Sequence, residues 1–347
     1  MTPRICAISL SHKTAPIALR ERIAVDDDRA AAILRRCADG FGEAVLLRTC
    51  GRLELYLAAD REIEPLSVFE KALGVPAETL RDHALALDEI PAADHLLKVA
   101  SGLLSPLPGE YHILGQARDA FTFAQSHRAT GPLLSALFRA AIHTGKRVRS
   151  ETAIGRLAQT YAAAAIGALR SRLTTDSRIL IVGSGTLAGE LARDMRAAGL
   201  RDITITSRHQ RRGRELASAI RGVWRPIDAL NAALSEANVV VCCTSSRSVL
   251  ITPSNFPNDD RDRVVLDLGM PRNVDTSIAQ QGGVVLIHLD DLRSGASLAD
   301  ECVRDAERII REETARFRAW CSRRRAYYTE AATGPSSAAR HRNEAAA

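Results

Sequence analysis

The sequence predicts a multidomain α/β protein: an α+β domain first, then a doubly wound domain around a parallel sheet, then one long helix. Three observations support this prediction. Short apolar runs of strand length mix with helical patterns in residues 1–155. Strands and helices mostly alternate through residues 156–290, which is typical of a parallel sheet with helices on both faces. Beyond them, apolar residues recur at helical spacing.

Short strands and longer helices make up the first predicted domain. Its strand-like runs are residues 5–10, 44–48 and 53–57. Residues 28–37 carry Ala, Ile and Leu at helical spacing, and the pattern is mostly helical from Pro91 to Arg172. Proline and glycine interrupt it in the loop 104–110 and again at 130–132.

A glycine motif opens the second predicted domain. Gly183-Ser-Gly185-Thr-Leu-Ala188 fits G-x-G-x-x-A, directly after the apolar strand 177–182 and at the start of a helix. The first glycine permits a tight turn, the second lets the backbone approach a pyrophosphate, and Ala188 allows close packing of helix on strand. This context predicts a Rossmann-type dinucleotide site with the cofactor-binding residues Gly183, Ser184, Gly185, Thr186, Leu187 and Ala188. Further strands are predicted at 202–206, 238–243, 263–267 and 283–287.

The residues after the second strand of this domain indicate which dinucleotide binds. A site for NADH usually has Asp or Glu there, to bind the ribose 2'-hydroxyl. Here the position holds Ser207 and Arg208, with Arg211 and Arg212 nearby. A hydroxyl and a guanidinium suit a 2'-phosphate, because arginine offers two parallel N–H donors to phosphate oxygens. We therefore predict NADPH as the cofactor, and we expect at least one of these arginines to face solvent only.

One long charged helix is predicted after the second domain, from Ser297 to Tyr327. Its apolar residues at helical spacing are Val303, Ala306, Ile309, Ile310, Phe317 and Trp320. We assign residues 291–328 to this helical region. The tail 329–347 is rich in Ala, Ser and Gly and is predicted to be disordered.

Composition narrows the class of protein. The chain has 347 residues, a net charge of +6 and seven cysteines. No apolar run approaches the roughly 18 residues that a membrane span needs, so we expect a cytoplasmic protein without a membrane segment. No CxxC pair occurs, and neither disulfides nor a metal site are predicted. The positive charge is compatible with a nucleic-acid partner, but the excess of arginine over lysine fits a general compositional bias better.

Cys50 is the candidate nucleophile. It lies in a turn between two strand-like runs, flanked by Arg48 and Arg52. Positive neighbours lower the pKa of a thiol and favour the thiolate, which is the reactive form. An inert core cysteine is the competing interpretation, because most intracellular cysteines are buried and no paired histidine is visible in the sequence. Chemistry alone leaves both interpretations open.

Several motifs resemble those of the glutamyl-tRNA reductase family, and they occur in order from about residue 5 to residue 328. The motifs in the first domain are Ser9-Leu-Ser-His-Lys-Thr-Ala-Pro16, Leu19-Arg-Glu-Arg22, Arg48-Thr-Cys-Gly-Arg52, His95-Leu-Leu-Lys-Val-Ala-Ser-Gly-Leu103, Gly109-Glu110, Ile113-Leu-Gly-Gln116 and Gly145-Lys-Arg-Val-Arg-Ser-Glu-Thr152. The late motifs are Asp267-Leu-Gly-Met-Pro-Arg-Asn-Val274 and Leu289-Asp-Asp-Leu292.

The resemblance implies a fold and an activity. Members of the family are V-shaped, with an N-terminal catalytic domain, an NADPH domain and a long helix that leads to a dimerisation domain. They reduce the glutamyl ester of tRNA to glutamate-1-semialdehyde, the first step toward tetrapyrroles, through a thioester on the cysteine. Hydride delivery requires the NADPH domain to approach that cysteine. Glutamate-1-semialdehyde aminomutase is an implied partner, and the shortened C-terminal region leaves a homodimer open.

The resemblance also assigns roles to single residues. Cys50 matches the nucleophile, and His95 matches the activity-critical histidine, a candidate acid or base for the leaving hydroxyl. Arg52 matches the residue that pairs with the substrate's side-chain carboxylate, and Glu110 is a candidate partner for the α-ammonium. The predicted substrate-binding residues are Thr49, Gly51, Arg52, Ser105, Glu110, Tyr111, His112 and Gln116.

Positions around the predicted pocket depart from the family pattern. Gly51 replaces the usual Asn, and Tyr111-His112 replaces the usual Pro-Gln. In the preceding loop, the usual Asp, Met and Leu are replaced by Leu104, Pro106 and Pro108. Three alternatives therefore stay open: reduction of another aminoacyl-tRNA, a non-catalytic regulator that binds tRNA or a partner protein, and an NADP-dependent dehydrogenase of a small free substrate. Retention of the nucleophile, the histidine and the arginine argues against the regulator.

Overall fold

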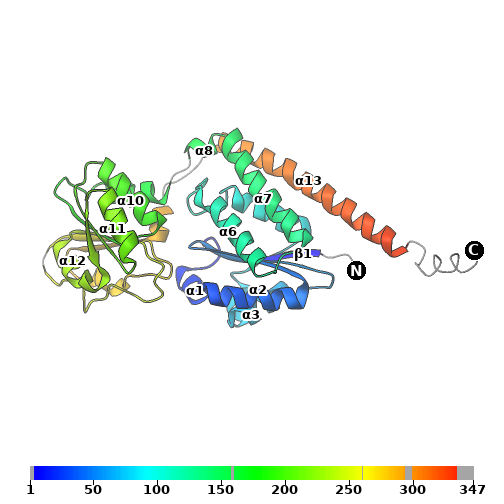
Figure 1. Ribbon diagram of the computed structural model, residues 1–347, viewed down its shortest axis with the longest axis horizontal. Helices are drawn as coiled ribbons and strands as arrows, with labels where there is room; N and C mark the ends of the chain where they lie inside the picture. The colour runs from blue at the N-terminus through cyan, green and yellow to red at the C-terminus, as the bar shows by residue number, and fades with distance from the viewer. Residues whose placement is uncertain (1–3, 158–159, 260, 294–298, 334–347) are drawn as a thin grey trace, which may run out of the picture.

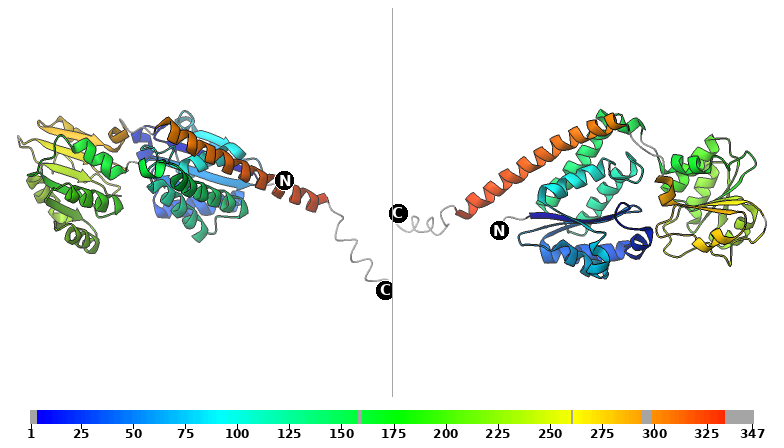
Figure 2. Two further views of the ribbon diagram at one scale, coloured as in Figure 1. Left: turned by 90° about the horizontal axis from the view of Figure 1, so that it is seen from above. Right: turned by 180° about the vertical axis from the view of Figure 1, so that it is seen from behind.

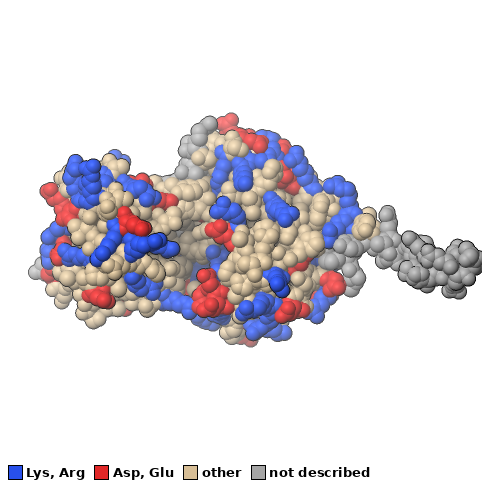
Figure 3. Space-filling view, viewed as in Figure 1, with Lys and Arg blue, Asp and Glu red and all other residues tan. Residues whose placement is uncertain are grey.

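The computed structural model describes residues 4–157, 160–259, 261–293 and 299–333, which form two domains and one long helix (Figure 1). This architecture confirms the predicted α/β class. Within these ranges, no helix is both long and apolar enough to cross a membrane. Lys and Arg side chains on the face in Figure 3 lie over both domains and are interspersed with acidic ones, so the positive charge on this face is spread rather than gathered.

A four-stranded antiparallel sheet forms the centre of the first domain, with the order β2-β3-β1-β4. The strands are β1 (Arg4–Ser11), β2 (Glu43–Thr49), β3 (Arg52–Ala59) and β4 (Leu85–Asp88). Every residue of β3 is buried, because the strand lies inside the sheet and helices cover both faces. The sequence does not indicate β4, which is short, mostly exposed and paired with β1 at the edge.

Helices α2 and α3 pack on one face of this sheet, and α5, α6 and α7 pack on the other (Figures 1 and 2). Asp26 caps α2 by accepting the Arg29 N–H at 2.7 Å, and Gly42, with a φ of +109°, follows its last residue. The helices are α1 (Ile17–Arg22), α2 (Asp27–Phe41), α3 (Pro65–Leu73), α4 (Ala77–Arg81), α5 (Glu89–Ala100), α6 (His112–Ser126), α7 (Pro132–Glu151) and α8 (Ile154–Leu157). The predicted break at 104–110 is the loop between α5 and α6.

The second domain contains a six-stranded parallel sheet with the order β10-β9-β8-β5-β6-β7. Alternate residues of β5 join different cores: Ile179 and Ile181 pack under α9 and α10, whereas Leu180 and Val182 pack under α12. The strand order reverses beside β5, and in doubly wound sheets ligands bind at the carboxyl ends of the strands at this point. The predicted doubly wound fold is therefore present.

The second domain consists of six strands, four α-helices and three 3-10 helices within the described residues. The strands are β5 (Arg178–Val182), β6 (Asp202–Ser207), β7 (Val223–Pro226), β8 (Val239–Cys242), β9 (Arg263–Asp267) and β10 (Val284–His288). The helices are α9 (Tyr161–Leu169), α10 (Thr186–Ala197), α11 (Gln210–Ala219), α12 (Leu230–Glu236) and the 3-10 helices η1 (Ile227–Ala229), η2 (Thr276–Gln280) and η3 (Leu289–Arg293). Strand β7 was not predicted, because it is a short edge strand that ends in proline.

Helix α13 (Asp300–Thr333) returns along the first domain and packs against α5 and α7 (Figure 2). Four of its residues at helical spacing, as predicted, join the core of that domain: Ala306, Ile309, Ile310 and Phe317. Residues 329–333 continue the helix. The prediction that a disordered tail begins at residue 329 is therefore wrong for these five positions, and the remainder of that tail lies outside the described residues.

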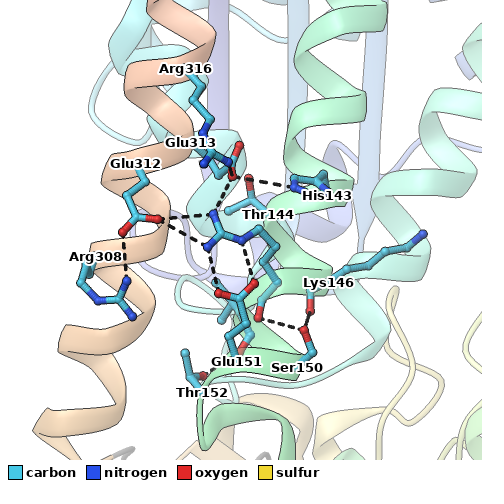
Figure 4. Close-up of polar contacts among 12 residues, drawn as sticks. His143, Thr144, Lys146, Ser150, Glu151, Thr152, Arg308, Glu312, Glu313 and Arg316 are labelled. Atoms are coloured by element: carbon cyan, nitrogen blue, oxygen red, sulfur yellow. Dashed lines mark hydrogen bonds and ion pairs between the residues drawn. The ribbon is translucent and has the colours of Figure 1, made fainter.

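Ion pairs hold α13 against α7 (Figure 4). Arg147 of α7 contacts Glu312 and Glu313 of α13 and also binds Glu151 at 2.8 Å. Glu313 is nearly buried and accepts a further hydrogen bond from Arg316 at 2.6 Å. A guanidinium shared by three carboxylates fixes the rotation of α13 about its axis, so the long helix is anchored to the first domain.

Candidate active site

Cys50 and Gly51 form the two-residue turn between β2 and β3. The Thr49 hydroxyl accepts the backbone N–H groups of Gly51 and Arg52, both at 3.1 Å. The Gly51 carbonyl accepts the N–H of His12 at 2.8 Å, which ties the turn to the end of β1. Thr49 therefore shapes the turn. The backbone N–H groups of Gly51 and Arg52 are bonded to its hydroxyl and so do not point toward a substrate oxygen.

A cavity of about 420 Å³ lies between the two domains, and Cys50 is part of its wall. The first domain contributes Arg20, Ile23, Ala24, Val25, Arg48, Thr49, Cys50, Arg52 and Leu53. The second domain contributes Leu187, Cys243, Thr244, Ser245, Leu268 and Met270. Cavities of 300–1,000 Å³ are the usual size for small-molecule sites. The half-buried Cys50 thus faces the second domain directly.

The Cys50 thiol is not activated in this arrangement. Burial and the nearby carboxyl of Glu110 raise its pKa to about 11, against the opposing effects of Tyr161 and Arg20. The Tyr161 hydroxyl has no hydrogen bond of regular geometry among the described residues, yet it lies close enough to the thiol to stabilise its charged form. The sequence did not single out Tyr161, which lies about 110 positions further along the chain.

The flanking arginines do not lower the pKa of the Cys50 thiol as the sequence suggested. Arg48 donates to the Val25 carbonyl at 2.9 Å and to Asp27 at 2.8 Å. Arg52 binds the carboxylate of Glu54 at 2.7 Å, which balances its charge. The expectation of a thiolate favoured by its sequence neighbours is therefore wrong for this arrangement, because both guanidinium groups are directed elsewhere.

Glu54 is the centre of a buried polar network beneath the turn. Its carboxylate accepts hydrogen bonds from Arg52 at 2.7 Å, Ser9 at 2.8 Å and Tyr56 at 2.6 Å, and His95 Nε2 lies 2.9 Å away. Glu54 is fully buried, and its contacts with His95 and Arg52 hold its pKa well below the usual range in spite of burial. Sequence reasoning missed this residue, although an acidic side chain within the apolar run 53–57 was the available signal.

His95 and Cys50 lie on different cavities. His95 lines a second cavity of about 350 Å³ in the first domain, whose wall also includes Ser9, Lys13 and Lys98. Arg52 is the residue that lines both this cavity and the one at Cys50. In this arrangement the His95 ring contacts Glu54 rather than the Cys50 thiol, and Glu54 in turn binds Arg52.

The loop 104–110 closes over the turn and carries Glu110. Ser105 donates to Glu110 at 3.4 Å, and both side chains are buried. Arg149 of α7 donates to the Glu110 carbonyl at 2.9 Å, and burial raises the pKa of the Glu110 carboxyl to about 7. Leu107, fully buried, packs into the core of the second domain and anchors the loop there. Gln116 lies further along on α6 and is half-buried.

Replacing Glu110 by glutamine is expected to stabilise the substrate-free protein at pH 8. The folded carboxyl has a pKa of about 7 and the ordinary value is 4.5, so the folded protein loses stability as the pH rises between these values. The difference corresponds to about 3 kcal/mol. Glu110→Gln cannot ionise and should melt several degrees higher than wild type at pH 8, with little difference at pH 4.5. Equal shifts at both pH values, or the same behaviour in the exposed control Glu62→Gln, would contradict this prediction.

Four of the departures from the family pattern contact one another or the second domain. A Cβ at Gly51 would lie 3.0 Å from Cγ of Pro106, so the glycine makes room for the proline. Tyr111 donates to Glu190 of α10 at 2.5 Å, and His112 Nε2 lies 3.2 Å from the same carboxylate. Tyr111 and His112, predicted to bind substrate, thus contact the helix that follows the glycine motif.

A groove of about 290 Å³ follows the carboxyl ends of β5, β6 and β8. Its walls include the predicted residues Gly183, Ser184, Gly185, Thr186, Leu187, Ser207 and Arg208, together with His209 and Arg212. Ala188 lies behind the groove, fully buried against the strand, and Arg211 points away to Glu215 at 3.6 Å. Ser207 accepts from Trp224 Nε1 at 3.3 Å.

The glycine turn fits a dinucleotide. Gly183 has a φ of +133°, and a Cβ there would lie 2.6 Å from the Cys243 carbonyl oxygen, so only glycine fits. A Cβ at Gly185 would meet nothing within 4 Å, so its backbone borders open space in which a pyrophosphate fits at the start of α10. The residues present therefore suit a pyridine dinucleotide.

Ion pairs join the two domains beside Cys50. Arg20 of α1 donates to Asp290 of η3 at 2.5 Å. Glu21 accepts two hydrogen bonds from the Arg272 guanidinium, at 2.7 and 2.6 Å, and one from its backbone N–H at 2.8 Å. The sequence motifs 19–22, 267–274 and 289–292 had no assigned role, and the structure brings them together at the domain boundary.

Comparisons with known proteins agree with this arrangement. Residues 8–152 match the family model of the glutamyl-tRNA reductase N-terminal domain, and residues 168–294 match that of shikimate/quinate 5-dehydrogenase. The chain is 34% identical to glutamyl-tRNA reductase of Deinococcus radiodurans, over 88% of this chain and 89% of that protein. It is 33% identical to that of Shouchella clausii, over 90% and 73%.

A solved structure, glutamyl-tRNA reductase from Methanopyrus kandleri, is similar with a TM-score of 0.50 and 26% identity, and the match covers 91% of this chain and 79% of that one. The N-terminal match contains the turn of Cys50 and the buried network of Glu54, and the second match contains the glycine turn. The chain belongs to the glutamyl-tRNA reductase family.

Proposed function

We propose that this protein reduces the glutamyl ester of glutamyl-tRNA to glutamate-1-semialdehyde with NADPH, the first step of tetrapyrrole synthesis by the five-carbon route. One observation carries the proposal. The cavity of Cys50 and the groove of the glycine turn share the wall residues Leu187, Cys243, Thr244 and Ser245. A nucleophile and a dinucleotide site are thus adjacent, as a thioester reductase requires.

The chemistry follows from the thiol. The Cys50 thiolate attacks the ester carbonyl carbon, a C–S bond forms, the C–O bond to the ribose breaks, and the ribose oxygen takes up a proton. The glycine turn, Ser207 and Arg208 would hold the dinucleotide in the groove, from which it would supply a hydride to the thioester carbon. The C–S bond then breaks, which releases the aldehyde and regenerates the thiolate. In the overall reaction, the ester, NADPH and one proton give the aldehyde, tRNA and NADP⁺.

The residues around Cys50 have positioning and binding roles in this proposal. Among the described residues, the Arg52 side chain donates hydrogen bonds to Glu54 and to the Leu104 carbonyl, whereas a guanidinium has five N–H donors. The remaining donors suit the glutamyl side-chain carboxylate in the Cys50 cavity. Glu110 lies close to the thiol and suits the α-ammonium, which would favour the ionised carboxylate. His95, held at Glu54, fixes the orientation of Arg52.

The preference for NADPH over NADH is expected to depend on Arg208. Arg208→Ala should raise the KM for NADPH about tenfold or more, because a charge-assisted hydrogen bond to phosphate is lost, and should leave the KM for NADH nearly unchanged. Arg211→Ala is the matched control, since Arg211 lies outside the groove and pairs with Glu215. Steady-state kinetics with both nucleotides test this, and an equal effect of Arg208→Ala on both would refute the assignment.

An NADPH-oxidation assay with a panel of aminoacyl-tRNAs tests the proposed function, with the aldehyde product identified by mass spectrometry. We expect turnover with glutamyl-tRNA and none with free glutamate. Turnover only with a different aminoacyl-tRNA would replace the proposal by that alternative, and tight tRNA binding without turnover on any substrate would favour a regulator. The product carries an amine and an aldehyde, and we propose that glutamate-1-semialdehyde aminomutase takes it up.

A further inference from the structure

Arg20 connects the nucleophile to the second domain. It is 5% exposed, and its guanidinium is held at three points. Nε donates to the Ala15 carbonyl at 3.2 Å, one terminal nitrogen donates to the Cys50 carbonyl at 2.8 Å, and the other donates to Asp290 at 2.5 Å. The first two partners belong to the first domain and the third to η3. Arg20 therefore touches Cys50 and the second domain at the same time.

Several elements around Cys50 contribute titratable or charged residues. Arg20 comes from α1, Arg48 and Arg52 from the two strands of the turn, Glu110 from the loop before α6 and Tyr161 from α9, while Cys243 lines the opposite wall. Arg48 is balanced by Asp27 and Arg52 by Glu54, both within the first domain. Among these described cations, Arg20 is the one whose carboxylate partner lies beyond the first domain.

We propose that Arg20 is a positioning residue through which docking of the second domain controls the charge state of Cys50. When Asp290 binds Arg20, the positive charge next to the cysteine is neutralised and the thiol is favoured. When the domains separate, the same guanidinium keeps its bond to the Cys50 carbonyl, its charge is no longer balanced by Asp290, and the thiolate is favoured. The inference deepens the proposed function and rests on the nucleophilic role of Cys50.

In the proposed control, docking of the second domain raises the pKa of the Cys50 thiol and separation lowers it. In the docked arrangement burial and Glu110 together raise the pKa of the thiol, and Arg20 only partly opposes them. Separation exposes the turn to water and removes Asp290, and both changes lower the pKa of Cys50. The nucleophile is therefore most reactive when the domains are apart, which is the arrangement that a bulky tRNA ester needs to reach it.

Two variants that cut the same ion pair test the proposal. The rate of Cys50 alkylation by iodoacetamide is measured against pH on the full chain, with the labelled peptide identified by mass spectrometry. Asp290→Asn is expected to lower the midpoint by about one pH unit, which makes labelling below the midpoint roughly tenfold faster. The reason is that a nearby opposite charge, here the guanidinium of Arg20, shifts a pKa by one to three units. Arg20→Gln is expected to leave the midpoint at or above the wild-type value.

The opposite behaviour of the two variants is the decisive outcome. If the ion pair only held the domains together, both variants would shift the midpoint in the same direction, and the proposal would fail. Arg20→Lys keeps the charge and should have a lower midpoint than Arg20→Gln. Glu21→Gln and Arg272→Gln each cut the neighbouring interdomain ion pair, which does not contact Cys50. These two variants should shift the midpoint of Cys50 alkylation by the same amount as each other. Melting temperatures confirm that each variant is folded.

The alkylation experiment needs neither tRNA nor nucleotide. If no aminoacyl-tRNA is reduced, the proposed function fails, while the midpoints of Asp290→Asn and Arg20→Gln still decide the role of Arg20. If the enzyme is active and both midpoints move together, only the inference about Arg20 is overturned.

Discussion

Cys50→Ser is expected to lower NADPH oxidation with glutamyl-tRNA by a factor on the order of 10³ or more. A serine hydroxyl has a far higher pKa than a thiol and is a weaker nucleophile, and an ordinary ester would replace the thioester that accepts hydride. Initial rates with charged tRNA measure the effect. Nucleotide affinity should be unchanged, because the groove of the glycine turn does not include Cys50.

Cys321→Ser is the matched control, since Cys321 is also half-buried but lies on α13, far along the chain from the turn. It should retain wild-type rates. Wild-type protein mixed with glutamyl-tRNA in the absence of nucleotide should accumulate a glutamyl adduct on Cys50, visible by mass spectrometry. Full activity of Cys50→Ser, or an adduct on another cysteine, would exclude Cys50 as the nucleophile.

Glu54→Gln is expected to destabilise the first domain by about 3–5 kcal/mol, because it leaves the buried guanidinium of Arg52 without a counter-charge. A loss of this size lowers the melting temperature by roughly 10 °C. The double variant Arg52→Met/Glu54→Gln should recover part of the loss, since it removes the unpaired cation as well. Thermal melts at pH 7 measure all three proteins.

Glu43→Gln is the control, because Glu43 is a buried carboxylate that has no cationic partner in the described part of the chain. Glu43 accepts the backbone N–H groups of Leu133 and Leu134 at 3.0 and 2.7 Å, and glutamine can keep one of these bonds. We expect a loss of about 1 kcal/mol. The depressed pKa of Glu54 also adds stability that is present above pH 4.5 and lost as the pH falls below it. Equal destabilisation by Glu43→Gln and Glu54→Gln would show that the ion pair has no special role.

Features that depend on neighbours in sequence were predictable. The glycine turn, the two-residue turn of Cys50 and the apolar stripe of α13 all follow from local spacing, and the structure contains each of them. The choice of Ser207 and Arg208 as groove residues came from their position after the second strand of a parallel sheet. The family resemblance, which the comparisons confirm, added the substrate and the reaction, which no spacing rule contains.

Features that depend on pairing across long distances were not predictable. Glu54 was missed because two of its partners, Ser9 and His95, lie 45 and 41 positions away, and Arg20 was missed because its partner Asp290 lies 270 positions away. A lowered pKa of Cys50 was one of two interpretations left open by its neighbours Arg48 and Arg52, and only the fold reveals that both arginines pair with carboxylates. A charge that is adjacent in sequence thus need not act on the neighbouring thiol.

The contact between Gly51 and Pro106 has an evolutionary consequence. A side chain at position 51 would press against the proline ring, and other residues at position 106 would leave a gap beside a bare glycine. Restoring the asparagine usual in the family at position 51 alone would therefore be harmful, whereas the same change together with a smaller or more flexible residue at position 106 would be tolerated. The two positions are therefore expected to vary together among relatives, with proline at position 106 accompanied by glycine at position 51.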